Sequence, residues 1–231
     1  MLTLGIETAT DVCAVALLRG RQPVADLAVL AQRSHATRLA PLVREALAHA
    51  GARPDALGVV AVSAGPGSYT GLRIGLSTAK GLCLATGAAL VAVPTLDALA
   101  DAARDAADEG DAVIVAARSR RGEVYGAAFE MRRGALVETR PSAPVALADL
   151  PAWCPSAARA WVLGDAADAV LKIFGPTARP LRARASALPI ALRGAERAAS
   201  GQTVDVASFE PDYLKPFEAT QPRAIFPEAT S

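Results

Sequence analysis

The chain has 231 residues, 52% of them hydrophobic, and its 24 basic and 23 acidic side chains leave a formal net charge of +1. So small a charge excludes nucleic-acid binding driven by the field of the whole molecule. No apolar run reaches the ~20 residues of a membrane-spanning helix, and the first residues lack the basic start of a secretory signal. Cys13, Cys83 and Cys154 form no Cys-x-x-Cys pair and are expected as small buried residues in a reducing compartment. We therefore expect a soluble, cytoplasmic protein of one large domain or two small ones.

The first 50 residues predict an antiparallel meander followed by a helix. Short turns at residues 8–11 and around Gly20 separate three apolar runs, and short turns between strands are typical of antiparallel pairing. The strands are expected over Leu2–Glu7, Val12–Leu17 and Val24–Leu30. A helix is expected from His35 to Ala50, because Ser34 can cap its start and Gly51 can end it. Its apolar stripe consists of Leu39, Leu42, Val43, Ala46 and Leu47.

A strand, a tight loop and a helix over residues 59–87 organise the rest of the chain. The apolar run Val59–Val62 predicts a buried strand, and the loop Gly65-Pro66-Gly67-Ser68 follows it. Ser68 or Thr70 can cap the next helix. That helix is expected to run to about residue 86, with Gly87 as its stop.

Small residues recur at four-residue spacing in this helix, at Gly71, Gly75 and Ala79. Positions four apart share one helical face, and each interior Gly costs roughly 1 kcal/mol relative to Ala. One hypothesis is that another helix approaches closely along this stripe, so that it binds a partner together with the helix from His35. The alternative is that the stripe packs inside the domain, against its own sheet.

The glycine-rich loop also suggests phosphate binding, although it fits neither common motif. A P-loop requires Lys after its second Gly, where this chain has Leu72. A dinucleotide-binding turn requires Gly where Thr70 stands. Free amides at a helix start can still hold an anion, so Gly65, Gly67, Ser68 and Thr70 form a candidate anion-binding loop, with a purely structural turn as the alternative.

The order of elements indicates two similar units. A strand over Ala89–Val93 and a helix from Thr95 to about residue 107 complete the order strand-strand-strand-helix-strand-helix-strand-helix, which is that of a ribonuclease-H-like unit. A polar break at residues 109–111 divides the chain into an N-terminal domain, 1–109, and a C-terminal domain, 110–231, in which the order is expected to repeat. Strands are expected over Ala112–Ala117, Val124–Met131, Leu136–Thr139 and Trp161–Leu163, and helices over Ala166–Phe174 and Ala185–Ala199. Residues 141–155, with four prolines, are expected as a loop, and the tail from Ala219 as loosely ordered.

Two ribonuclease-H-like units in tandem make the actin-like (ASKHA) α/β fold of actin and the sugar kinases, which commonly holds ATP between its halves. The first hairpin of such ATPases carries an Asp and a Gly-rich turn. Here the hairpin Ile6–Asp11 contains no Gly, and Glu7 takes the place of the Asp. The alternative is a plain turn in which Thr8 and Asp11 bond to the backbone.

Five segments carry a family resemblance. They are GIETAT at residues 5–10, SHA at 34–36, AGPGSYTGLRIG at 64–75, RRGEVY at 120–125 and PDYLK at 211–215. Together they resemble the bacterial TsaB family, also called YeaZ, over essentially the whole chain, and GPGSYTGLRIG is the most specific part. One departure is that the family usually reads Asp-Ala-Arg before its Gly-Glu-Val-Tyr, and Arg118 stands where that Asp is usual.

The resemblance implies a noncatalytic relative of TsaD, the subunit that transfers a threonylcarbamoyl group to adenosine 37 of certain tRNAs. TsaB pairs with TsaD through two helices of its first domain, TsaE joins the pair, and TsaB alone forms homodimers through the same surface. Contact with tRNA is then indirect or weak, and no cofactor of its own is implied. On this chain the partner-binding residues are expected to be His35, Leu39, Leu42, Tyr69, Gly71, Leu72, Arg73, Gly75 and Ala79.

A metal site and a catalytic set are not expected. TsaD carries two histidines four residues apart on this helix, whereas this chain has His35 followed by Leu39, which cannot coordinate a metal. The other histidine, His49, lies 14 residues from His35, or about 21 Å along a helix, too far for one ion with ligand distances of about 2 Å. No Ser-His-Asp or Cys-His set is recognisable around Ser63, Ser68 or Cys13.

Two interpretations stay open at this point. The residues Arg118, Arg120 and Arg121 form a local basic run, which is either a solvated turn or a contact to tRNA phosphate. The chain as a whole is either a noncatalytic partner subunit or an actin-like ATPase or sugar kinase. The small-residue helix and the missing ligands favour the partner subunit, and the incomplete phosphate turns count against the kinase.

Overall fold

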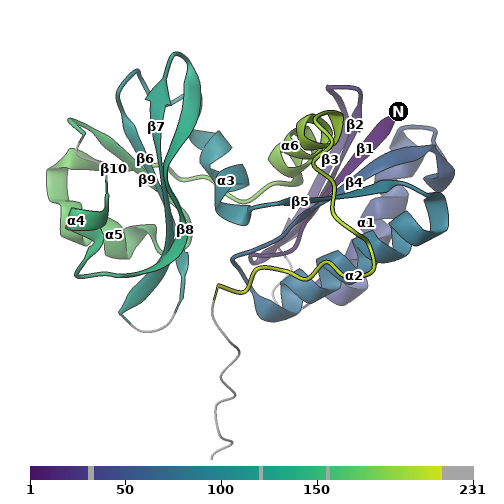
Figure 1. Cartoon of the computed structure of the whole chain (residues 1–231), viewed down its shortest axis with the longest axis horizontal. Coiled ribbons are helices and arrows are strands. Elements are labelled where there is room, and N and C mark those ends of the chain that lie inside the picture. The colour runs from purple at the N-terminus through teal and green to yellow at the C-terminus, as the bar shows by residue number, and fades with distance from the viewer. Residues whose placement is uncertain (31–33, 120–121, 155–156, 215–231) are drawn as a thin grey trace, which may run out of the picture.

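The computed structural model describes residues 1–30, 34–119, 122–154 and 157–214, and it contains two five-stranded sheets (Figure 1). The first lobe is the sheet of β1 to β5 with the helices on its faces, and the second lobe is the sheet of β6 to β10 with its helices. Counted within its own lobe, each sheet has the strand order 3-2-1-4-5. In each, the first three strands pair antiparallel and the last two pair parallel. The α/β class and the repetition of the order are therefore confirmed.

The first sheet consists of β1 Leu2–Glu7, β2 Val12–Arg19, β3 Gln22–Leu30, β4 Leu57–Ser63 and β5 Ala89–Val93. Its central strands are apolar on both faces because both faces are covered. Helices α1 His35–His49 and α2 Tyr69–Thr86 pack on one face, around Leu4, Ile6 and Val60. Helix α6 Ala187–Ala199 packs on the other face. The expected strands and both early helices are thus confirmed.

The caps of α2 are also as expected. The Ser68 hydroxyl accepts a hydrogen bond from the Gly71 amide, and Gly87 ends the helix in the left-handed conformation, with φ of 76°. Ser34 stands at the start of α1, but its side chain makes no capping bond. The Thr37 amide bonds to the Ser34 carbonyl oxygen instead.

The second sheet consists of β6 Ala112–Arg118, β7 Glu123–Arg132, β8 Ala135–Ala146, β9 Ala160–Leu163 and β10 Ala178–Pro180. Helices α4 Leu150–Trp153 and α5 Ala167–Phe174 cover one face of this sheet. Helix α3 Thr95–Ala100 covers the other face, where Leu96 and Leu99 pack on Val113 and Val115. Short 3-10 turns occur at Pro54–Ala56, Asp101–Ala103 and Gly175–Thr177.

Two helices pack on the sheet of the other lobe, not on the sheet nearest to them in the order of the chain. Helix α3 comes before the second sheet in the chain and packs on it, whereas α6 comes after the second sheet and packs on the first (Figure 1). Arg193 of α6 ties the two helices together by donating to the Asp101 carboxylate at 2.6 Å. Packing therefore crosses the sequence division near residue 109.

Several expectations from residue 95 onward need correction. Helix α3 ends at Ala100 and not near residue 107, because the chain enters a 3-10 turn, held by the Arg104–Asp101 ion pair, before it enters β6. Strand β8 continues to Ala146, through residues expected as a loop. Its prolines are tolerated because β8 is an edge strand, where a missing N–H breaks no inner ladder. The short β10 was missed, and so was α4, which lies within residues 141–155 that were expected as a loop. The tail from Ala219 lies outside the described residues.

Candidate functional site

The loop between β4 and α2 is held by bonds within the chain. The Gly65 amide donates to the Thr95 hydroxyl at 3.2 Å, and the Ser68 amide donates to the Ala9 carbonyl at 2.7 Å. The Asp212 amide donates to the Ala64 carbonyl at 2.8 Å. Two loop amides are thus already bonded, and anion binding by this loop stays a prediction.

Glu7 closes the turn of the first hairpin from inside the protein. Its side chain is 1% exposed, and Oε1 accepts hydrogen bonds from the amides of Ala9 at 2.9 Å and Thr10 at 3.1 Å. Burial raises the pKa of this carboxyl from 4.5 to about 7, against the lowering effect of its hydrogen bonds. Glu7 and Thr10, rather than Asp11, therefore bind the turn, since the Thr10 hydroxyl also accepts from the Val12 amide.

A cleft of about 590 Å³ lies where the two lobes meet. Its lining includes Thr10, Asp11, His35 and Ser68 from the first lobe, Arg118 and Asp165 from the second, and Arg184 from the segment between β10 and α6. His35 is buried, and its Nε2 lies 3.1 Å from the Thr10 carbonyl oxygen. This contact ties α1 to the first hairpin and accounts for a histidine in the first turn without a metal.

Arg118 forms an ion pair with Asp165 on the wall of this cleft. The Arg118 amide donates to Oδ1 of Asp165 at 2.7 Å, and its Nε donates to Oδ2 at 2.8 Å. The Asp165 carboxylate, and to a lesser extent that of Asp11, raises the pKa of the Arg118 guanidinium. The residue that departs from the family pattern is therefore bonded to an acid that follows β9. Arg120 and Arg121, the other members of the basic run, lie outside the described residues.

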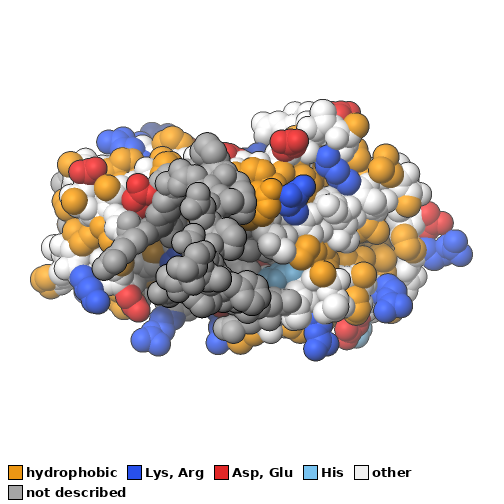
Figure 2. Space-filling model, turned by 90° about the horizontal axis from the view of Figure 1, so that it is seen from below, with side chains coloured by type: hydrophobic (Ala, Val, Ile, Leu, Met, Phe, Trp, Pro, Cys, Tyr) orange, Lys and Arg blue, Asp and Glu red, His pale blue; other side chains and the backbone are white. Residues whose placement is uncertain are grey.

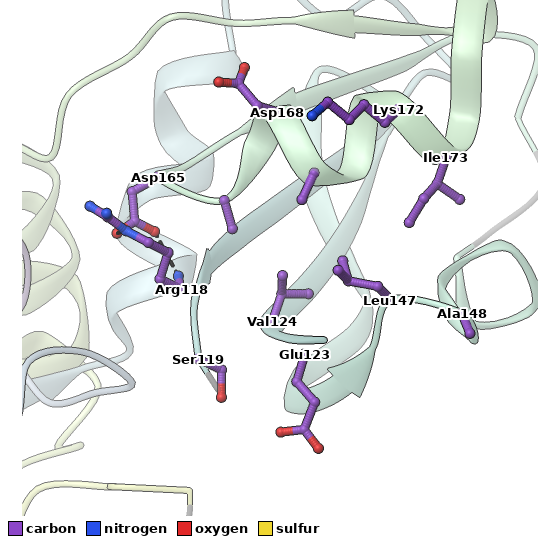
Figure 3. Close-up of a pocket in the computed structure, with 12 residues that line it drawn as sticks. Arg118, Ser119, Glu123, Val124, Leu147, Ala148, Asp165, Asp168, Lys172 and Ile173 are labelled. Carbon is purple, nitrogen blue, oxygen red and sulfur yellow. Dashed lines mark hydrogen bonds and ion pairs between the residues drawn. The ribbon is translucent and has the colours of Figure 1, made fainter. Parts of the chain in front are cut away.

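The same ion pair borders a second pocket, of about 840 Å³, within the second lobe (Figure 3). Apolar side chains of β7, α5 and the segment after β8 face this pocket, among them Val124, Leu147 and Ile173. Sequence reasoning missed this pocket, because its walls come from three segments that are far apart in the chain.

The described part of the chain brings no metal-ligating set together. Among the described residues, no group of three or more His, Cys, Asp and Glu side chains could hold a metal ion. The three cysteines are buried and unpaired, and burial raises the pKa of each thiol to about 11. Within the described chain, no helix has the length and apolar character to span a membrane.

The small-residue stripe lies inside the first lobe, contrary to the hypothesis that it faces a partner. The Thr8 hydroxyl donates to the Gly71 carbonyl at 2.9 Å, and a Cβ at Gly75 would collide with Thr8 Oγ1. Ala79 is fully buried in the core of the lobe. Positions 71 and 75 require Gly because α2 lies directly against the first hairpin and leaves no room for a Cβ. Of the expected partner-binding residues, His35, Leu39, Leu42 and Leu72 are also buried, and only Tyr69 and Arg73 are exposed.

The C-terminal segment crosses α2, which the sequence did not reveal (Figure 1). Val204 bridges to Leu90 of β5, and Lys80 of α2 donates to the Ala207 carbonyl at 3.0 Å. The rings of Tyr69 and Tyr213 lie 4.8 Å apart. Tyr213, within the PDYLK segment noted in the sequence, thus packs against the start of α2, and Lys215 lies outside the described residues. In the view of Figure 2, basic side chains are scattered among hydrophobic and acidic ones, both along the outline and within the visible face.

These features define a class: an α/β protein of two equivalent sheets that meet at a cleft. Solved structures share this fold, among them component A of the (R)-2-hydroxyglutaryl-CoA dehydratase of Acidaminococcus fermentans, at a TM-score of 0.51 and 14% identity, which shows the fold alone. YeaZ from Pseudomonas aeruginosa is more similar, with a TM-score of 0.79 and 28% identity over 92% of this chain and 99% of that one.

Sequence comparison gives the family. Residues 29–149 match the family model described as TsaD, tRNA N6-adenosine threonylcarbamoyltransferase, so the chain belongs to this family. Its relatives include tRNA threonylcarbamoyladenosine biosynthesis protein TsaB of Haemophilus influenzae, 36% identical over 53% of this chain and 51% of that protein. The TsaB protein of Bacillus subtilis is 33% identical over 64% of each chain. The matches thus span about half to two thirds of these curated relatives, and with YeaZ they confirm the resemblance to TsaB.

Proposed function

We propose that this chain is a noncatalytic subunit in the formation of threonylcarbamoyladenosine on tRNA, in the cytoplasm. Its likeness to proteins named for tRNA threonylcarbamoyladenosine biosynthesis carries the proposal. In this proposed role, the chain binds a TsaD-type transferase and, together with TsaE, activates the transferase. In their absence it forms a homodimer.

The outer face of α2 has features that favour binding of a protein partner. Gly81 lies in the interior of this helix, and a Cβ added there would meet nothing within 4 Å. Its cost to the helix, roughly 1 kcal/mol relative to Ala, is therefore not explained by packing against the described residues. Leu84, one turn further, is 78% exposed, and Ser77 lies one turn before. We assign the partner surface to Ser77, Gly81 and Leu84, with Tyr69 and Arg73 at the start of the helix.

The first hairpin supports a noncatalytic role. Glu7, which takes the place of the Asp of related ATPases, is buried, and its Oε1 is occupied by two backbone amides. A carboxylate in this position is not available to a nucleotide or to a metal ion bound to one.

We propose the tandem ribonuclease-H-like, actin-like description for the fold, with domains 1–109 and 110–231 that exchange α3 and α6.

An actin-like ATPase or sugar kinase is the alternative, favoured only by the cleft of about 590 Å³ between the lobes. Titration calorimetry of ATP into the full chain separates the two functions. Binding and turnover that disappear on Glu7→Gln would favour the ATPase.

The partner surface is tested by Gly81→Arg. The variant should fold as the wild type does, because position 81 opens to solvent, and it should no longer co-elute with the TsaD-type protein of the same organism. Ala199→Arg, at an exposed position on α6, is the matched control and should co-elute normally. In a deletion strain, mass spectrometry of bulk tRNA should show loss of threonylcarbamoyladenosine, restored by the control and not by Gly81→Arg. Normal levels of the nucleoside in the deletion strain would refute the proposed function.

A further inference from the structure

A row of exposed arginines runs from the edge strand of the second sheet to the cleft between the lobes. Strand β10 is the last strand of this sheet, and the chain continues from it to α6 (Figure 1). Arg179, Arg182 and Arg184 are all exposed along this stretch. Between them, Leu181 and Ala183 pack on the core of the second lobe. We call Arg179, Arg182 and Arg184 the arginine edge.

These arginines differ from most others in the protein because their charges are not neutralised. Arg159 donates to Asp111, and Arg193 donates to Asp101. Among the described arginines, six side chains make no hydrogen bond, ion pair or ring contact. They are Arg38, Arg44, Arg133, Arg179, Arg182 and Arg184, so half of them fall within six consecutive residues.

The edge is also free of acidic residues and its backbone is fixed. Residues 176–186 contain no Asp or Glu. The acids of other segments that share a pocket lining with these arginines are Asp111 beside Arg179, and Asp11 and Asp165 beside Arg184. Residues 178–180 pair with β9, and the Leu181 amide donates to the Val162 carbonyl at 2.9 Å. The three cations are therefore held on an anchored stretch of at most about 17 Å, and no long loop must be ordered before they can bind an anion.

We propose that the arginine edge contacts the phosphates of RNA, an inference that rests on the proposed function and gives the chain a direct part in holding the tRNA. The guanidinium group bonds phosphate oxygens in pairs, so arginine suits this contact better than lysine. The exposed side of the segment offers three arginines and no large apolar side chain. Interfaces with proteins have an apolar core, which is missing here, so the features favour a nucleic-acid backbone over an acidic protein.

The test measures binding of unfractionated tRNA to the full chain by fluorescence anisotropy at about 50 to 200 mM KCl, a range over which phosphate contacts weaken strongly. The variant combines Arg179→Gln, Arg182→Gln and Arg184→Gln. The control combines Arg38→Gln, Arg44→Gln and Arg133→Gln, which removes the same charge from the other unpaired arginines. The edge variant should bind about tenfold or more weakly at low salt, and its slope of log affinity against log salt should fall by about 2 to 3. The control should stay close to the wild type.

Three results would overturn the inference. They are no measurable binding by the wild type at the lowest salt, an equal loss in both variants, and displacement of tRNA by polyglutamate as readily as by tRNA at equal charge. Each result leaves the partner role intact, because that role is tested by co-elution of Gly81→Arg with the TsaD-type protein. Circular dichroism melts of both variants must match the wild type, and the salt slope separates a lost phosphate contact from a change of fold.

Discussion

The two lobes place a hairpin at the same position of the same sheet, and they stabilise it by opposite means. In the first lobe, the turn between β1 and β2 is bound by Glu7, a buried carboxyl that forms no ion pair with any described residue. In the second lobe, Arg118 at the end of β6 is bound to Asp165, and the Arg118 side chain is 72% exposed. When the ion pair between Arg118 and Asp165 is broken, water can solvate both exposed charges. The buried groups around Glu7 would lose their hydrogen bonds without gaining water in exchange. The same topology therefore makes one hairpin rigid and costly to alter, and leaves the other open to substitution.

The largest effect is expected where α2 lies against the first hairpin. Gly75→Arg would direct a charged side chain toward Thr8 and Val62, where even a Cβ has no room. A buried charge without a partner should lower the free energy of unfolding by about 3–5 kcal/mol. Urea denaturation measures the loss, and Gly81→Ala, on the open face of the same helix, should instead stabilise by about 1 kcal/mol. A Gly75→Arg protein as stable as the wild type would show that the two faces of α2 do not differ as described.

The second effect follows from the pKa of Glu7. In the unfolded chain this carboxyl ionises near 4.5, and in the folded protein near 7. The folded state therefore holds the proton more tightly, so its contribution to stability is complete below pH 4.5 and is lost as the pH rises to about 7. The loss amounts to about 3 kcal/mol.

Glu7→Gln removes this loss, because Gln can still accept the amide hydrogen bonds and cannot ionise. The difference in unfolding free energy between pH 5 and pH 8 should shrink by up to about 3 kcal/mol relative to the wild type. Glu210→Gln, at an exposed position of the C-terminal segment, is the control and should leave the difference unchanged. Parallel pH profiles for the wild type and Glu7→Gln would contradict the raised pKa.

The smallest effect is expected at the second hairpin. Arg118→Gln removes an exposed ion pair, while the bond from the backbone amide to Asp165 can remain. Exposed pairs contribute about 0–1 kcal/mol, and salt screens them. Urea denaturation at low and high KCl should show a loss within this range that fades as salt is added. A loss above about 2 kcal/mol that persists at high salt would mean that both hairpins depend on buried polar contacts.

Local patterns in the sequence predict much of this fold. Apolar runs separated by short turns locate the strands of the first sheet, and Ser68 and Gly87 fix both ends of α2. These signals are local, because they depend on the backbone within one turn or one strand. The family resemblance rests on the same segments.

The errors concern contacts between distant segments. Four-residue spacing shows that Gly71, Gly75 and Ala79 share a face, but periodicity does not say what that face meets. Here it meets Thr8, more than 60 residues earlier in the chain. Gly81 of the same helix lies outside the stripe, and its surroundings are open. The prolines of β8 similarly look like loop residues until the strand is known to lie at an edge.

The exchange of α3 and α6 has a consequence for how the protein is made. The five strands of the first sheet have all been synthesised by Val93, but the helix that covers one of its faces ends at Ala199. At the 5–20 residues per second of translation, this helix follows roughly 5–20 s later. During that interval the nascent chain on the ribosome has an uncovered apolar surface, formed in part by Val12, Ala14 and Leu18. Folding of the first lobe can therefore be completed only after the second lobe has been synthesised.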